Sequence, residues 1–68
     1  MRTHNEIVDD LFRWIKQKKS FTVADIKDLK KEYIGHEKTM LLTILSNMYD
    51  SGLLIEHNDG STSFRNQP

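Results

Sequence analysis

Histidine, serine and glycine are the residues of this sequence whose spacing could support metal-binding, nucleophilic or phosphate-binding chemistry. His4, His36 and His57 are the only histidines among the 68 residues, and there is no cysteine. Because zinc sites take cysteine and histidine ligands at short, fixed spacings, these separated histidines do not form a metal motif. The serines lack a nucleophile-elbow context, and the three glycines do not form a phosphate-binding loop. We therefore expect no catalytic residue, no metal site, no cofactor and no enzymatic activity.

Basic side chains are the second group with chemistry of their own, because lysine and arginine bind phosphate. The formal net charge is zero, yet residues 13–31 contain seven of the ten basic residues and only two acids, a local balance of +5. The rest of the chain carries −5. Such segregation can produce a dipolar surface with one phosphate-facing side, or simply a set of solvated helix faces.

Length and composition describe one small globular domain. The hydrophobic fraction of 37% and the charged fraction of 29% suit a folded chain rather than a disordered one. No apolar run is long enough for a membrane span, and no signal-peptide pattern opens the sequence. We expect a cytoplasmic protein with no membrane partner, one domain over residues 1–65 and a disordered tail over 66–68.

Three amphipathic segments predict three helices. The first spans residues 3–19, where Thr3 and Glu6 have the spacing of a capping box. Its outer side places Asp9 four residues before Arg13, a favourable ion-pair spacing. The second helix is short, and Thr22 can cap it. The third spans 37–52, with one apolar stripe made of Met40, Leu41, Ile44, Leu45 and Met48.

The segment GLLIEHNDGSTSF, residues 52–64, predicts a β-hairpin. Asp-Gly is a strong signal for a two-residue hairpin turn. With Asp59 and Gly60 as the turn, Ile55 faces Phe64, and Leu53 shares their side of the hairpin. This register predicts that these three apolar side chains pack against the helices.

The order of helix, short strand, short helix, helix and hairpin resembles the winged helix-turn-helix family. The residues that carry this resemblance are TMLLTILSNMYDSGLLIEHNDGSTSFR, where Gly52-Leu53-Leu54-Ile55 resembles the step into the wing, the family's hairpin. The resemblance implies an α+β, mostly α fold with three helices and a small three-stranded antiparallel sheet. Residues 21–23 would be its short strand, paired with the wing.

The resemblance also implies a small DNA-binding regulator of transcription, in which the third helix enters the major groove of duplex DNA. Free-standing domains of this kind are typical of accessory regulators on phages and other mobile elements. The groove-facing residues would be Lys38, Thr39, Thr43, Ser46 and Asn47. The phosphate contacts would be Lys27, Lys30, Lys31 and Arg65.

An alternative is a winged helix that binds a protein partner and no DNA, as at the end of the middle subunit of replication protein A. The predicted outer face of the third helix is neutral, and the wing carries Glu56 and Asp59, which repel phosphate. We expect the DNA-binding regulator to act as a homodimer. Val8 and Phe12 on the first helix are its candidate contacts, whereas we expect Trp14 to pack in the core.

Overall fold

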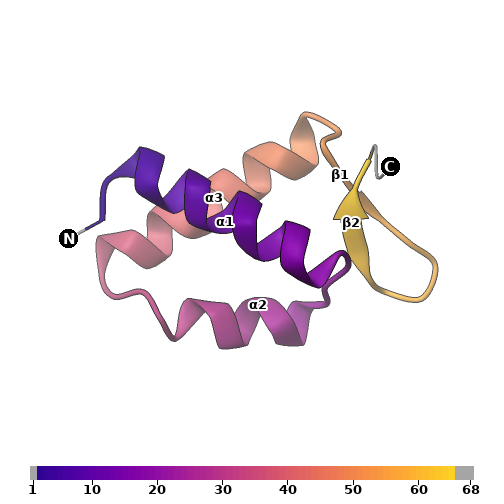
Figure 1. Cartoon of the computed structure of the whole chain (residues 1–68), viewed down its shortest axis with the longest axis horizontal. Coiled ribbons are helices and arrows are strands. Elements are labelled where there is room, and N and C mark those ends of the chain that lie inside the picture. Colours follow the sequence, from indigo (N-terminus) through magenta and orange to yellow (C-terminus); the bar gives the residue numbers. More distant parts are fainter. Residues whose placement is uncertain (1, 66–68) are drawn as a thin grey trace.

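Three helices followed by a β-hairpin make up the computed structural model, which describes residues 2–65 (Figure 1). The elements are α1 (His4–Lys18), α2 (Val23–Lys30), α3 (His36–Asp50), β1 (Leu54–Glu56) and β2 (Thr62–Phe64). In Figure 1, α1 crosses in front of α3, α2 lies below both, and the hairpin stands at the end opposite the N-terminus. The molecule is elongated, with extents of 34 × 21 × 21 Å. The tail predicted for 66–68 lies outside the described residues.

Capping boxes start α1 and α2, as the sequence predicts for Thr3 with Glu6. The Thr3 hydroxyl accepts from the Glu6 backbone N–H at 3.2 Å, and the Glu6 carboxylate accepts from the Thr3 N–H at 2.9 Å. Thr22 and Asp25 make the same reciprocal pair, at 3.4 and 2.9 Å. These hydrogen bonds hold the pKa values of Glu6 and Asp25 below the ordinary carboxyl range. The position at which each helix begins is therefore determined by side chains only three residues apart.

Gly52 ends α3 and turns the chain toward the hairpin. It has a φ of 81°, which a residue with a side chain adopts at a steric cost. The Gly52 N–H donates to the Tyr49 carbonyl at 3.1 Å, and the Leu53 N–H donates to the Met48 carbonyl at 3.0 Å. This pair of bonds is the Schellman motif, and it satisfies carbonyls that the helix end leaves without partners.

The core lies between α1, α2, α3 and the inner side of the hairpin. Trp14 is partly buried and packs on Phe21, with 5.0 Å between ring centroids, so it contacts the core as predicted. Tyr33 is buried, but its neighbour Ile34 is 75% exposed and does not pack inward. The buried apolar residues are Ile7, Leu11, Ile15, Phe21, Leu29, Tyr33, Leu41, Ile44, Leu45, Met48 and Leu54.

The hairpin register differs by one residue from the predicted one. Leu54, not Ile55, pairs with Phe64, and the turn is a three-residue loop over 58–60. The Asp59 carboxylate accepts from the Ser61 backbone N–H at 3.0 Å and from its hydroxyl at 2.7 Å, and these bonds stabilise the longer loop. Gly60, with a φ of 88°, provides the left-handed residue that such a loop requires.

This shift exchanges the two faces of β1, because side chains alternate along a strand. Leu54 is 4% exposed and packs in the core. Ile55 is 39% exposed and Leu53 is 37% exposed, so the prediction that these two side chains pack inward is wrong. The actual inner pair is Leu54 with Phe64.

The sheet of the described residues has two strands, not the predicted three. Of the expected strand 21–23, only Phe21 pairs, through an isolated bridge to Thr62. Thr22 is the N-cap of α2, and Val23 is the first residue of that helix. Because Thr22 and Asp25 form a capping box, the helix begins at Val23, and strand pairing with the hairpin is limited to Phe21.

Candidate functional site

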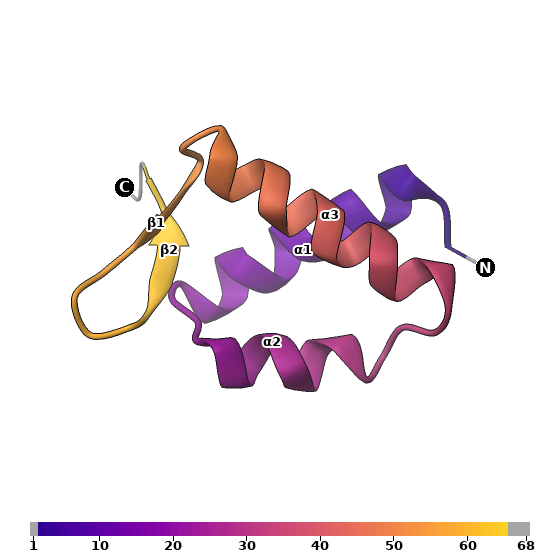
Figure 2. The ribbon, with the colours of Figure 1, turned by 180° about the vertical axis from the view of Figure 1, so that it is seen from behind.

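The outward side of α3 is a run of short polar side chains. Thr39, Thr43, Ser46 and Asn47 are all exposed, whereas the opposite side of the helix contains the core residues Leu41, Ile44, Leu45 and Met48. Within residues 2–65, none of the four polar side chains makes a hydrogen bond. Figure 2 shows α3 in front of α1, with α2 below it. The face that the sequence predicts is therefore exposed, and its polar side chains have no hydrogen-bond partner among the described residues.

The predicted phosphate-contacting lysines lie on α2, at its C-cap and in the first turn of α3. Lys27, Lys30 and Lys38 form no ion pair with any described residue. Lys31 differs, because its ammonium lies 3.5 Å from the Asp28 carboxylate. Three of these four lysines thus form no ion pair among residues 2–65, and the charge of the fourth is partly neutralised.

Arg65 lies apart from these lysines. Its backbone N–H donates to the Leu53 carbonyl at 2.8 Å, which places it at the base of the hairpin rather than at its tip. Its guanidinium is 3.6 Å from the point where a side chain on Gly52 would begin. This position is beyond the last turn of α3, about 20 Å along the helix from Lys38. The structure does not bring Arg65 together with the lysine group.

Two large side chains border the polar face on its other side. Leu42 is 43% exposed and Tyr49 is 38% exposed. The Tyr49 hydroxyl is 2.9 Å from the Thr62 hydroxyl, so this aromatic ring links α3 to the hairpin. The outward side of α3 is therefore polar in its centre and partly apolar along one edge.

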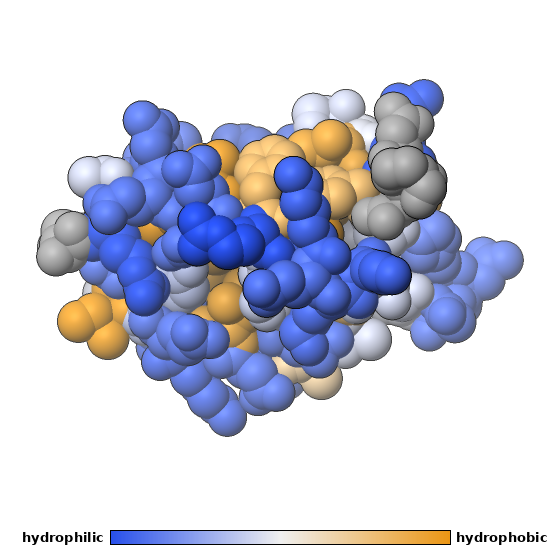
Figure 3. Space-filling model, in the orientation of Figure 1, coloured by the Kyte–Doolittle hydropathy of each residue, from blue (hydrophilic) through white to orange (hydrophobic). Residues whose placement is uncertain are grey.

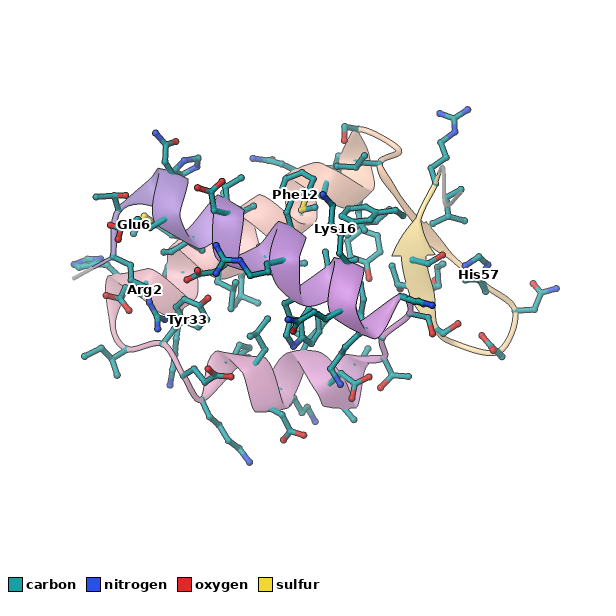
Figure 4. The ribbon with its side chains drawn as sticks, viewed as in Figure 1. Arg2, Glu6, Phe12, Lys16, Tyr33 and His57 are labelled. Atoms are coloured by element: carbon teal, nitrogen blue, oxygen red, sulfur yellow. The ribbon has the colours of Figure 1, made fainter. Side chains whose placement is uncertain are left out.

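A shallow groove separates α1 from α3 and contains both predicted dimer contacts. Val8 and Phe12 are partly buried, and Phe12 stacks on Phe64 with ring centroids 5.5 Å apart. The groove has a volume of about 310 Å³, and its floor includes Ile44 and Met48. Figure 3 shows an apolar patch on this side of the molecule, and Figure 4 shows Phe12 on the upper side of α1.

A polar cluster that the sequence does not predict ties the N-terminal segment to the helices. The Arg2 backbone N–H donates to the buried Glu37 carboxylate at 2.9 Å, and the Arg2 guanidinium lies 3.6 Å from Asp10. Arg2 also stacks over the Tyr33 ring at 4.4 Å, beside it in Figure 4. Burial, with the nearby Asp10 carboxylate, raises the pKa of Tyr33. Local spacing gives no signal for these contacts, because they join residues far apart in the chain.

Catalytic or metal-binding geometry does not emerge among residues 2–65. His57 Nε2 lies 2.6 Å from the Ser63 hydroxyl, but both groups sit on the open hairpin with no enclosed site around them. No described group of histidine and carboxylate side chains is arranged to hold a metal ion.

None of the described helices has the length and apolar character needed to cross a membrane. Comparison with protein-family models, curated proteins and solved structures finds no match to this chain.

Proposed function

We propose that this chain is a small winged helix-turn-helix protein that binds duplex DNA through α3 and α2 and acts as a regulator of transcription. The observation that carries the proposal is the α3 face. Its four polar side chains, Thr39, Thr43, Ser46 and Asn47, are exposed and make no hydrogen bond within the described fold. A helix face with no internal partners is available to base edges.

The chemistry of this face suits the major groove. An α-helix fits into that groove, and short side chains let its backbone approach the bases closely. Asn47 can make two hydrogen bonds to adenine, and the threonine methyl groups can contact the thymine methyl. Lys27, Lys30 and Lys38, which have no ion-pair partner in the described residues, would contact phosphates and set the orientation of α3.

Three phosphate contacts set the expected strength of binding. Counterion release gives a slope of log affinity against log salt of about −0.9 per contact, hence about −2.7 here. Affinity should then fall about fortyfold between about 0.05 and 0.2 M salt. Fluorescence anisotropy with random-sequence duplex DNA measures both quantities. Absence of binding even at the lower salt would end the DNA proposal.

A second candidate function is binding of a protein partner without DNA. The observation that favours it is the apolar edge of α3, where Leu42 and Tyr49 are both more than one-third exposed. Glu56 and Asp59 on the hairpin also disfavour a phosphate backbone at that end. Two results together would support this function. The chain would show no DNA binding, and Thr43→Glu would abolish binding of a purified protein partner while the helical circular dichroism stays unchanged.

A further inference from the structure

The loop of the hairpin carries the one Asp-Gly step of the sequence, Asp59-Gly60. Both residues are exposed, and a side chain built on Gly60 would meet no atom within 4 Å. In Figure 4 the loop projects beyond His57, away from the helices. Solvent water therefore reaches this peptide bond freely. Because glycine has no side chain, its backbone nitrogen can also approach the carboxyl group of the aspartate before it.

An Asp-Gly step can rearrange without an enzyme. The Gly60 nitrogen loses its proton and attacks Cγ of the protonated Asp59 carboxyl. A C–N bond forms, a C–O bond breaks, and the hydroxyl leaves with that proton as water, so the product is a cyclic succinimide. Water then opens the ring at either carbonyl, which returns aspartate or gives isoaspartate. In isoaspartate the main chain runs through the side-chain carbons and is one carbon longer.

The electrophile of this reaction, the Asp59 carboxyl, is held by Ser61. Its Oδ1 accepts from the Ser61 hydroxyl at 2.7 Å and from the Ser61 backbone N–H at 3.0 Å. The hydroxyl bond, together with the backbone bond, keeps the pKa of Asp59 below the ordinary carboxyl range. To react, the carboxylate must take up a proton and give up the bonds that favour its charged form.

The nucleophile, the Gly60 nitrogen, is also held within the loop. Its N–H donates to the His57 carbonyl at 3.0 Å, and the His57 N–H donates to the Ser61 carbonyl at 2.7 Å. Loss of the Gly60 proton breaks the first of these bonds. Both reacting groups therefore make hydrogen bonds in the folded loop that the reaction has to break.

We propose that Asp59-Gly60 is a site of spontaneous aspartate isomerisation and that Ser61 protects it in the folded hairpin. The extra main-chain carbon of isoaspartate would displace Ser61 and the next residue, Thr62, whose backbone pairs with Phe21. The modification should therefore weaken the attachment of the hairpin to the helices. The proposal concerns the chemistry of the loop alone and does not rest on DNA binding.

The rate of isoaspartate formation tests the protection. The full chain is kept at neutral pH, folded in buffer or unfolded in urea, and the isomer is measured by peptide mapping with electron-transfer fragmentation. The folded chain should accumulate isoaspartate at least about tenfold more slowly than the unfolded chain, because reaction first needs local opening of the loop. This comparison needs no variant, so it holds even if a substitution in the loop prevents folding.

Substitutions of Ser61 test its part in the protection. Ser61→Ala removes one hydrogen bond to the carboxylate, so the folded variant should isomerise at least about threefold faster than the folded wild type. In urea the two chains should react at the same rate, because the loop is absent from both. Ser61→Thr restores the hydroxyl and should return the folded chain to the wild-type rate.

A matched control is Ser63→Ala, which removes another hairpin hydroxyl. That hydroxyl contacts His57 Nε2 and not Asp59, so the rate should stay at the wild-type value. Circular dichroism before incubation checks that each variant is folded. Equal rates for folded and unfolded wild type would overturn the proposal. So would a folded Ser61→Ala chain no faster than the wild type, or a Ser63→Ala chain that is accelerated as much as Ser61→Ala.

Discussion

Phe21 and Thr62 exchange two backbone hydrogen bonds, 2.9 and 2.7 Å long, at a bridge where both side chains are buried. Phe21 lies in the connection between α1 and α2, and Thr62 begins β2. An isolated two-stranded hairpin is marginal in water. Here the bridge, together with Leu54 and Phe64 on the inner side, attaches the hairpin to the helices.

The hydroxyl of Thr62 should contribute to this attachment through Tyr49, 2.9 Å away. Thr62→Val keeps the shape of the side chain and removes that hydrogen bond, so we expect a loss of about 1 kcal/mol in the free energy of unfolding. Urea denaturation measures the loss. In a Tyr49→Phe background the same change should cost clearly less, and equal costs in both backgrounds would show that the hydroxyls do not interact.

The register of the hairpin predicts that truncation of two neighbouring side chains of similar size changes the free energy of unfolding by different amounts. Leu54→Ala removes a core residue and should cost about 2–4 kcal/mol, whereas the exposed Ile55→Ala should cost less than about 1 kcal/mol. Thermal denaturation of the two variants checks this order. The reverse order would indicate the two-residue turn that the Asp-Gly step suggests.

Lys19, the C-cap of α1, is the only non-glycine residue in the described range with a positive φ, at 67°. A side chain is strained in this region, so Lys19→Gly should stabilise the fold by about 1 kcal/mol and raise the melting temperature by about 4–8 °C. Lys19→Ala keeps the strain and serves as the control with the same loss of charge. Equal melting temperatures for the two variants would show that no strain is relieved.

The capping carboxylates should make the fold sensitive to acid. The backbone hydrogen bonds of Thr3 and Thr22 lower the pKa values of Glu6 and Asp25 in the folded state. Their contribution to stability is therefore fully present above the ordinary carboxyl pKa, about 4, and is lost as the pH falls through the lowered values. Urea titrations at about pH 7 and about pH 3 measure this loss.

A double variant isolates these two groups from the other carboxylates. Glu6→Gln with Asp25→Asn keeps an oxygen acceptor at each cap but removes the titrating charge. The stability of this variant should change less between the two pH values than that of the wild type. An unchanged difference would assign the acid sensitivity to other residues.

The lysines of α2 should differ in their contribution to DNA affinity. Lys27→Gln removes a charge with no ion-pair partner in the described fold, and it should reduce the salt slope by about 1. Lys31→Gln removes a charge that Asp28 already partly neutralises, so a smaller change is expected. Anisotropy titrations at several salt concentrations compare the two, and equal effects would contradict this assignment.

Local signals in the sequence account for most of what it predicts correctly. The Thr3 capping box and the glycine stop after α3 depend on residues only a few positions apart, and both are present. The polar face of α3 follows from the helical period, and all four of its short side chains are exposed as expected. These features need no knowledge of the tertiary structure.

The failed predictions are those in which two local rules compete or a distant contact decides. Asp-Gly suits either a two- or a three-residue loop, and the hydrogen bonds that Ser61 donates to the Asp59 carboxylate favour the longer one. Thr22 suits a strand as well as a helix cap, and the cap prevails. The contact between Arg2 and Glu37 spans 35 positions, so no short pattern reveals it.

We expect the hairpin to open locally, because one bridge, between Phe21 and Thr62, is the ladder pairing that joins it to the helical part of the described chain. Opening it breaks two backbone hydrogen bonds outside the hairpin ladder, while the helix hydrogen bonds of α1 and α3 stay in place. Segments of this kind exchange their amide protons through local opening rather than through global unfolding. The amide protons of Phe21 and Thr62 should therefore exchange faster than those in the middle of α1 and α3. A ligand that binds the hairpin should slow the exchange of these two amide protons before that of any others.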